Sequence, residues 1–410
     1  MNEQLIVKNF GPIKDATVDF KRVTVFIGPT GGGKSTLAKL AAILRNEIYS
    51  ILELGNQKER KSFLSDYNLT NYAQEESATY SINGEVIKGL DFKTEAIHSS
   101  LGNEINLLIQ SSKDKAKLDN QEASKLIEEA KLIMRENLDK AMILLSEAEN
   151  IIKNPVDSWI KNKTKEVAFV VSPYYIPSER IFVPAIEYSW AGLMRDDIGL
   201  PKTLLDFANS FSTSRKDISE LHIPFFNVTY KHINGRDFIK IPEREELLIL
   251  LETASGIQSV TPMLVLLEHL SQHKNQAQSF IIEEPELNLY PTAQQGLLNW
   301  LVKKCTTGEN DLTITTHSPY ILSHLNLLLY AYQVAEKHPD RADDVAKVVP
   351  RESWINPKEF ACYQVEGGGV QSLVDEVLGL IDNNELDALS GDAADAFDNL
   401  IRLSKSVATK

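Results

Sequence analysis

The sequence predicts an α/β fold in which a mixed β-sheet is flanked by helices and carries an α-helical insertion. The first observation is a set of short β-branched or apolar runs, typical of buried strands: Val23–Ile27, Phe280–Ile282 and Leu312–Thr315. The second is helical spacing from Ser35 to Arg45, directly after the first run. The third is the stretch from about Ser112 to Lys161, which is rich in Glu, Lys, Ala and Leu and free of glycine.

The N-terminal part is predicted to form strand, turn, strand, loop and helix. Leu5 to Val7 is a short apolar run, and apolar residues alternate with polar ones from Ala16 to Phe20. The Val23–Ile27 run then leads into a glycine-rich loop and the helix. Farther along, strand-like segments from about Ser77 to Phe92 surround Asn83-Gly84, which is a hairpin signal.

The glycine-free stretch predicts long amphipathic helices, such as a helical hairpin or coiled coil. Two interpretations stay open: one packed helical subdomain, or an arm that carries partner contacts. Its apolar residues recur at helical spacing, namely Leu126, Ile127, Ala130, Ile133, Leu138, Ala141, Leu144, Leu145, Ala148, Ile151 and Ile152.

The rest of the chain returns to strand-like runs after Val167, and a helical pattern resumes from about Glu245. An amphipathic helix is predicted between the last two buried strands. A strand near Tyr363–Val365 is followed by acidic helical segments. These patterns divide the chain into an N-terminal part, a helical insertion, a second α/β part and a small α/β extension, at residues 1–110, 111–165, 166–345 and 346–410.

Composition limits the class of protein and of partner. The 410 residues carry a net charge of −14, which argues against a surface coated in positive charge for binding DNA, although a local basic groove is not excluded. The small cluster Lys58, Arg60 and Lys61 is interpreted as solvated surface. Neither a membrane span nor a secretory signal is predicted, and Cys305 and Cys362 are expected to be reduced thiols. We therefore expect a cytoplasmic protein without a membrane partner.

The glycine-rich loop, Gly28-Pro29-Thr30-Gly31-Gly32-Gly33-Lys34-Ser35, has the spacing of a phosphate-binding loop. Glycines permit backbone angles that turn N–H groups toward phosphate oxygens, and the helix that begins there adds its positive dipole end. Lys34 can reach the outer phosphates, and Ser35 can ligate Mg²⁺. The loop predicts ATP and Mg²⁺ as cofactors, bound by Gly28, Pro29, Thr30, Gly31, Gly32, Gly33, Lys34, Ser35 and Thr36.

Two adjacent carboxylates, Glu283 and Glu284, end the strand that begins at Phe280. Successive side chains diverge along a strand, so the two acids are expected to do different work. We assign Glu283 to the orientation of Mg²⁺ and Glu284 to the polarisation of the water that attacks the γ-phosphate.

Three segments, in this order, resemble ATP-binding-cassette (ABC) ATPases of the SMC, RecF and OLD type, found among bacterial DNA-maintenance and phage-defence proteins. They are Val7–Ile13, which leads into the phosphate loop, Ile282–Pro291, which contains the acid pair, and Thr315–Pro319. The resemblance covers roughly the first 45 residues and the stretch from about 250 to 330. It implies an ABC-type P-loop ATPase head.

The resemblance also assigns roles to residues outside the loop. Ser255-Gly256-Ile257-Gln258 resembles the signature sequence, which in such ATPases contacts the γ-phosphate held by another subunit. On its own, a Ser-Gly pair before a helix is more often a plain helix cap. His317 matches the switch histidine and is expected to contact the γ-phosphate and the attacking water. Arg180 lies in a segment common in the OLD-like branch and is expected either to sense nucleotide, to bridge subunits or to form a structural ion pair.

Two departures from the family pattern predict slow turnover. Thr30 stands where the phosphate loop often has asparagine, and Ile257 replaces the second glycine of the signature. Neither change removes a group that is essential for hydrolysis.

The resemblance implies an Mg²⁺-dependent ATPase that forms a homodimer or higher homo-oligomer. We expect it to act as a sensor that controls a separate effector protein, such as a nuclease, in bacterial anti-phage defence. The alternative is a DNA-repair or chromosome-maintenance ATPase that clamps nucleic acid directly, which the acidic composition counts against. A nucleotide-binding subunit of a transporter fits the opening motif less well.

The chain itself is not expected to be a nuclease. Tyr363–Gly368 superficially resembles the opening of the nuclease domain in the OLD-like branch, but only about 45 residues follow it. No strand-borne Asp-x-Asp pair occurs among them. The later acids, Asp375, Glu376, Asp382 and Asp387, are predicted to lie on exposed helices.

Overall fold

The computed structural model describes residues 3–46, 64–69, 72, 77–82, 85–91, 173–186, 199–272, 277–382, 397, 400 and 401. The predicted helical insertion at 111–165 lies outside these residues, as do the Lys58–Lys61 cluster and Asp387. Within the described part of the chain, no helix has the length and apolar character needed to cross a membrane.

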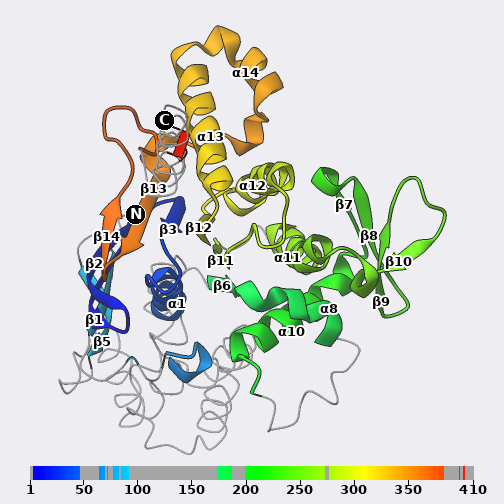
Figure 1. Cartoon of the computed structure of the whole chain (residues 1–410), viewed down its shortest axis with the longest axis horizontal. Coiled ribbons are helices and arrows are strands. Elements are labelled where there is room, and N and C mark those ends of the chain that lie inside the picture. The colour runs from blue at the N-terminus through cyan, green and yellow to red at the C-terminus, as the bar shows by residue number, and fades with distance from the viewer. Residues whose placement is uncertain are drawn as a thin grey trace, which may run out of the picture.

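Six strands of the described chain form the central sheet (Figure 1). Five of them are parallel, and β14 runs antiparallel to its neighbour β13. The three runs that predicted buried strands are adjacent in this sheet, which confirms the mixed sheet flanked by helices. The spatial order is β14 (Gly369–Ser372), β13 (Phe360–Glu366), β3 (Val23–Ile27), β12 (Asp311–Thr316), β11 (Ser279–Glu283) and β6 (Pro173–Ile176).

The two faces of the central sheet are buried in two separate hydrophobic clusters. Because side chains alternate along a strand, Phe26 and Ile281 belong to one cluster, whereas Val25 and Ile282 belong to the other. The first cluster includes α1 (Lys34–Arg45) together with β1 and β2. The second is built mainly from three long helices, α11 (Ser255–Gln272), α12 (Pro291–Cys305) and α13 (Pro319–Lys337).

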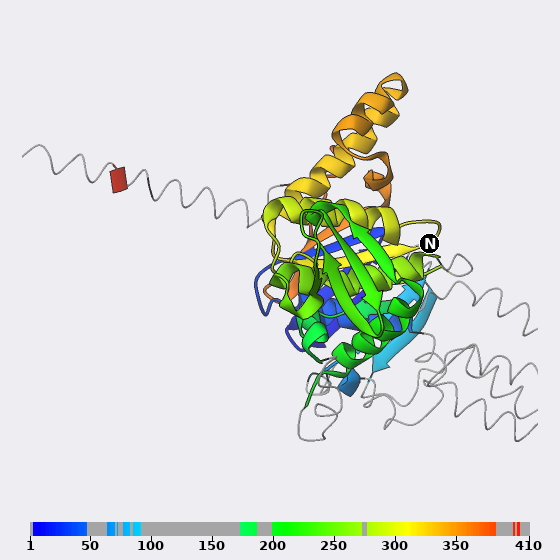
Figure 2. The ribbon, with the colours of Figure 1, turned by 90° about the vertical axis from the view of Figure 1, so that its right-hand side faces the viewer.

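Two smaller antiparallel sheets lie beside the central one. The N-terminal sheet covers α1, and its β4 and β5 pair as the hairpin predicted around Asn83-Gly84. The other sheet lies near α10 and α11 and faces the viewer in Figure 2. In spatial order, the first contains β2 (Ile13–Phe20), β1 (Glu3–Phe10), β4 (Ser77–Ile82) and β5 (Glu85–Asp91), and the second contains β10 (Leu247–Ile249), β9 (Arg236–Lys240), β8 (Val228–Ile233) and β7 (Glu220–Ile223).

Shorter elements complete the described chain. The turn η2 (Ser178–Phe182) follows β6 and leads into α8 (Val183–Ile186). The helix α10 (Lys202–Asp217) packs against α11, and α14 (Ala342–Val348) packs against α13 above the sheet in Figure 1. Cys305 and Cys362 are both buried free thiols, as expected.

The structure corrects the predicted start of one helix. The helical pattern was placed from about Glu245, but Leu247–Ile249 pairs with β9 as strand β10. The helix begins only at Ser255, after Thr253 in an extended conformation. Apolar residues that satisfied helical spacing therefore belong to an edge strand, because strand pairing outweighs local periodicity.

The strand predicted near Tyr363–Val365 is present as β13, which lies beside β3 in the central sheet, with Phe360 opposite Val23. The prediction for the acids that follow it is wrong where the structure describes them. Asp375, Glu376 and Asp382 do not lie on helices. Asp375 and Glu376 belong to a turn closed by the Val374–Ile381 bridge, in which the Asp375 carboxylate accepts hydrogen bonds from the backbone amides of Val377 and Leu378, and Asp382 directly follows this bridge.

Candidate active site

The phosphate loop begins where β3 ends at Ile27, and it lies directly against the backbone of β13. A Cβ at Gly28 would lie 2.3 Å from the Val365 carbonyl oxygen, and one at Gly32 would lie 2.6 Å from it. Gly28 also has a φ of 140°. Only glycine fits these two positions, because a side chain would push the loop off its neighbouring strand.

The loop ends as the N-terminus of α1. Gly33 occupies the cap position with φ 108° and provides no side chain for the first amides. A Cβ there would lie 2.4 Å from Cδ1 of Ile13, so β2 holds the loop from the other side. The helix therefore starts with amide groups that point toward the loop, which is the arrangement that binds phosphate.

Lys34, the first residue of α1, is buried under the loop. Its ammonium donates hydrogen bonds to the carbonyl oxygens of Gly28 at 2.8 Å and Pro29 at 2.9 Å. Burial lowers the pKa of Lys34, while the charges of Glu284, Glu286 and Glu283 oppose that shift. The structure thus brings the predicted lysine and the acids that follow β11 into one electrostatic neighbourhood.

The other predicted loop residues differ in exposure. Pro29, Thr30 and Gly31 are exposed at the tip of the loop. Ser35 is half-buried, and Thr36 is buried in the first turn of α1. The tip is therefore open to a ligand, whereas the base of the loop is fixed by packing.

The acid pair diverges, as the sequence predicted. Glu283, the last residue of β11, is 3% exposed, and within the described chain its Oε1 has no hydrogen-bond partner. The pKa of the neighbouring Tyr175 is raised well above its ordinary value, mainly by burial and secondly by the charge of Glu283. Glu284 is half-buried and has left the strand, with a φ of 41° that residues other than glycine rarely adopt.

His317 meets Glu284 at the carboxyl edge of the sheet. The His317 Nε2 lies 3.3 Å from Glu284 Oε1, and both side chains are partly exposed. The backbone supports this pair, since the Glu284 amide donates to the Thr315 carbonyl at 2.9 Å. The ends of two neighbouring strands, β11 and β12, therefore place the predicted base and the predicted switch histidine together.

Sequence reasoning gave no role to Glu286, although it fixes the position of the switch histidine. Its Oε1 accepts hydrogen bonds from Thr316 Oγ1 at 2.5 Å and from the His317 amide at 3.0 Å. Burial raises the pKa of Glu286 above its ordinary value. The sequence shows only a third acid shortly after β11, and an acid at such a position is equally typical of a solvent-exposed loop.

Gln294 extends the same network into α12. Ser318 caps α13 and donates from its hydroxyl to Gln294 Oε1 at 2.5 Å. This buried contact ties the segment after His317 to the helix that follows the acids. The sequence gave no sign of it, because the partners are 24 residues apart.

Arg180 lies behind the acid pair and is fully buried. Its guanidinium donates to the carbonyl oxygens of Pro177, Glu283 and Glu284, at 3.1, 2.6 and 2.6 Å. Burial lowers the pKa of Arg180 to about 10, so the group stays charged at neutral pH. These contacts favour a role for Arg180 in fixing the backbone of the acid pair, rather than in sensing nucleotide directly.

The signature-like segment starts α11, on the face of the sheet opposite α1. Ser255 is exposed at the first position of the helix. A Cβ at Gly256 would lie 2.7 Å from the Asn288 carbonyl oxygen, so the segment packs on the loop after the acids. The side-chain amide of Gln258 donates from Nε2 to the carbonyl oxygens of Leu251 and Thr253, at 2.8 and 2.6 Å. It therefore stabilises the turn that precedes α11.

A family model described as an AAA ATPase domain matches residues 56–322, which is more than half of the chain. The chain belongs to the AAA ATPase domain family. The matched range contains the signature-like segment, the acid pair and His317, whereas the phosphate loop precedes it. The match confirms the predicted ATPase domain.

Two solved structures are similar to this AAA ATPase. One is the Smc head domain of Pyrococcus furiosus with an extended coiled coil, bound to the C-terminal domain of ScpA, at a TM-score of 0.33 and 11% identity over 90% of this chain and 94% of that one. The other is the SMC head domain from Thermotoga maritima, at 0.34 and 11% over 91% and 98%. No curated protein matches the sequence.

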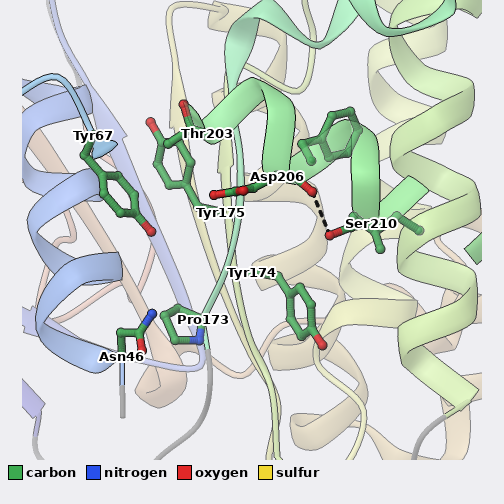
Figure 3. Close-up of a pocket in the computed structure, with 10 residues that line it drawn as sticks. Asn46, Tyr67, Pro173, Tyr174, Tyr175, Thr203, Asp206 and Ser210 are labelled. Atoms are coloured by element: carbon green, nitrogen blue, oxygen red, sulfur yellow. Dashed lines mark hydrogen bonds between the residues drawn. The ribbon is translucent and has the colours of Figure 1, made fainter. Parts of the chain in front are cut away.

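A cavity of about 200 Å³ in the AAA ATPase lies at the edge of the sheet opposite the candidate active site, and Figure 3 shows the residues that line it. It is bordered by the start of β6 and by Asn46, which ends α1. The Tyr67 ring packs edge-on against Tyr175, with centroids 5.4 Å apart. Because the phosphate loop lies at the other end of α1, this cavity is separate from the candidate active site.

Proposed function

We propose that this AAA ATPase binds Mg-ATP at Gly28–Thr36 and hydrolyses it with Glu284 as the general base. The observation that carries the proposal is the Glu284–His317 pair, 3.3 Å apart, in the same electrostatic neighbourhood as Lys34. A base, a histidine donor and a lysine next to a phosphate loop are the groups that phosphoryl transfer to water needs.

The residues present fit a magnesium ion. Ser35 offers a hydroxyl in the first turn of α1, and Glu283 offers a buried carboxylate oxygen that lacks a partner in the described chain. Hard oxygen donors of this kind, completed by phosphate oxygens and water, suit Mg²⁺. When bound, the ion would neutralise charge on the phosphates.

The protein's own groups then have distinct tasks. Lys34 exchanges the carbonyl oxygens of Gly28 and Pro29 for the outer phosphates of ATP. Glu284 accepts a proton from water as the water oxygen bonds to the γ-phosphorus and the bond to the bridging oxygen of ADP breaks. His317 donates a hydrogen bond to the γ-phosphoryl group, whose charge it stabilises.

We further propose that ATP is bound between two copies of the chain. The exposed Ser255 hydroxyl at the N-terminus of α11 supports this arrangement, since hydroxyl and amide donors there suit an anion from another molecule. Slow turnover is expected, because Thr30 and Ile257 depart from the pattern of such ATPases.

The biological role that the resemblance supports best is that of a sensor in the cytoplasm, which controls a separate effector protein in bacterial anti-phage defence. The net charge of −14 weighs against the alternative, an ATPase that clamps DNA directly for repair or chromosome maintenance. The effector could itself be a nuclease.

The test measures the mass and the hydrolysis rate of the wild type and of Glu284→Gln, with and without Mg-ATP, together with any protein that co-purifies from the native host. We expect Glu284→Gln to lower hydrolysis by about 10²–10⁴-fold and to accumulate an ATP-bound oligomer. Lys34→Ala is the control that should lose tight ATP binding.

Normal hydrolysis by Glu284→Gln would show that another group is the base. A stable monomer that binds DNA and no protein would favour the DNA clamp over the sensor. Unchanged ATP affinity in Lys34→Ala would rule out the phosphate loop as the binding site.

A further inference from the structure

Arg180 is the buried charge whose partners are hardest to explain by stability alone. It lies on η2, and none of its nitrogens lies within ion-pair distance of a carboxylate in the described chain. Its three hydrogen bonds all go to backbone carbonyl oxygens, and its Nε has no partner among the described residues. The charges of Glu286, Glu284 and Glu283 favour its charged form from a distance, whereas its direct contacts are all with the backbone, which points to a task in holding that backbone.

The backbone that Arg180 contacts is the part of the site under strain. Glu284 has a φ of 41°, in the left-handed region, which non-glycine residues keep only when their surroundings impose it. The Glu284 amide is fixed by the Thr315 carbonyl. Conformations of this type need restraint on both sides of the Cα.

The guanidinium supplies that restraint through both of its amino groups. Nη1 donates to the Glu283 carbonyl and Nη2 to the Glu284 carbonyl, each at 2.6 Å. The relative orientation of these two carbonyls is set by φ and ψ of Glu284. A planar fork that binds both at once therefore fixes both angles, which the single ammonium of a lysine does not do.

We propose that Arg180 is a positioning residue, which holds the Glu283 and Glu284 carbonyls and thereby keeps the Glu284 carboxylate facing His317 and the attacking water. This role rests on the proposed function of Glu284 as the base. It differs from nucleotide sensing and from bridging subunits, because Arg180 acts from behind the acids.

The test compares the wild type, Arg180→Lys, Glu284→Gln and the double variant, with rates expressed per ATP-binding site. We expect Arg180→Lys to bind ATP as the wild type does, with an unchanged KM, and to lose about 10²-fold in kcat, as a misplaced group does. Like Glu284→Gln, it should accumulate an ATP-bound oligomer.

The double variant separates positioning from independent action. If Arg180 works only through Glu284, adding Arg180→Lys to Glu284→Gln lowers the rate no further, because effects of groups that act as a unit are not additive. Arg45→Lys is the matched control, since Arg45 is also buried but contacts carboxylates; its kcat should stay at the wild-type value. Arg180→Gln replaces Arg180→Lys if the lysine variant does not fold.

Each alternative gives its own result. A rise in the ATP dissociation constant with normal kcat would mean direct nucleotide contact, and loss of the oligomer alone would mean subunit bridging. A further fall in the double variant, or normal hydrolysis by Arg180→Lys beside a slow Glu284→Gln, would overturn the positioning role alone. Normal hydrolysis by Glu284→Gln would overturn the base assignment and the positioning role together.

Discussion

The two ends of strand β11 each have a buried arginine, but the two are bound in opposite ways. At the amino end, Arg45 donates to Glu3 at 2.6 Å, to Asp311 at 2.9 Å and to Ser279 at 2.7 Å. Its guanidinium also lies 4.3 Å from the centre of the Phe20 ring. Charge, hydrogen bonds and packing are all satisfied there.

At the carboxyl end, charges are crowded and incompletely paired. Glu283, Glu284 and Glu286 lie within one short segment, while Arg180 and Lys34 donate to main-chain carbonyl oxygens rather than to the carboxylates of these acids. Within the described chain, Glu283 Oε1 and Glu286 Oε2 have no hydrogen-bond partner. One end of the strand therefore serves stability, whereas the other, under the proposed function, holds unpaired charges for the reaction with ATP at the expense of stability.

The largest predicted effect is at the satisfied end. Arg45→Met leaves the partly buried carboxylates of Glu3 and Asp311 without their cation, which should lower the free energy of unfolding by about 3 kcal/mol. The kcat of the folded fraction should stay at the wild-type value. Urea unfolding and ATPase assays below the unfolding temperature check both statements.

An exposed pair provides the control for Arg45. Lys8 lies 3.8 Å from Asp15 with both side chains more than half exposed, so Lys8→Met should change stability by less than about 0.5 kcal/mol. If Arg45→Met reduced kcat as strongly as Arg180→Lys, the division between the two ends would be wrong.

An intermediate effect is predicted for Glu286→Ala, at the crowded end. The change orphans the Thr316 hydroxyl and the His317 amide, and it should destabilise the fold by about 2–3 kcal/mol. Hydrolysis should fall as well, because His317 loses the anchor of its main chain. Thermal unfolding and kcat, measured on the same samples, test whether stability and activity fall together.

The isosteric variant Glu286→Gln keeps a side-chain acceptor oxygen but no longer has a carboxyl group that can bind or release a proton. Burial raises the pKa of Glu286 above its ordinary 4.5, so the folded state binds more protons than the unfolded state in the range between the two values. Wild-type stability should therefore fall, relative to Glu286→Gln, as the pH rises from 4.5 through the raised pKa. Parallel stability curves would contradict a buried Glu286 with a raised pKa.

The smallest predicted effect links the signature helix to the crowded end. In Gly256→Ala the new Cβ would lie 2.7 Å from the Asn288 carbonyl oxygen and 2.9 Å from Leu289 Cδ2, so the loop after the acids must move. We expect a loss of about 1–2 kcal/mol and a modest fall in kcat. Gly199→Ala, where a Cβ meets open space, is the control in chemical denaturation. Equal effects of the two changes would argue against packing of the signature helix on this loop.

The parts of the site that could be predicted are contiguous in the sequence. The phosphate loop, the acid pair and His317 each lie at or directly after the end of a buried strand. The pattern that predicts each strand and the side chains with a predicted role are therefore only a few residues apart. Parallel strands then place these ends at one edge of the sheet. The central sheet itself was predictable for the same reason, from its three apolar runs.

The parts that could not be predicted depend on distant partners. Arg180 contacts carbonyl oxygens 103 and 104 residues away, and nothing in its own segment indicates backbone contacts rather than an ion pair or a nucleotide. The pairing of β13 with β3 joins Phe360 to Val23, and no local pattern in the sequence indicates this partner strand. Gln258 matches the signature sequence, but its side-chain amide donates hydrogen bonds to the backbone of the preceding turn.

The contact between the phosphate loop and the Val365 carbonyl has a consequence for biosynthesis. Gly28 leaves the ribosome long before Val365, because 337 residues (365 minus 28) separate them. At typical elongation rates this interval lasts roughly 20–70 s. During that time the loop lacks the strand that backs it, so a nascent chain does not yet contain a finished nucleotide site. Under the proposed function, ATP binding at this loop is therefore expected only late in translation, when β13 pairs with β3.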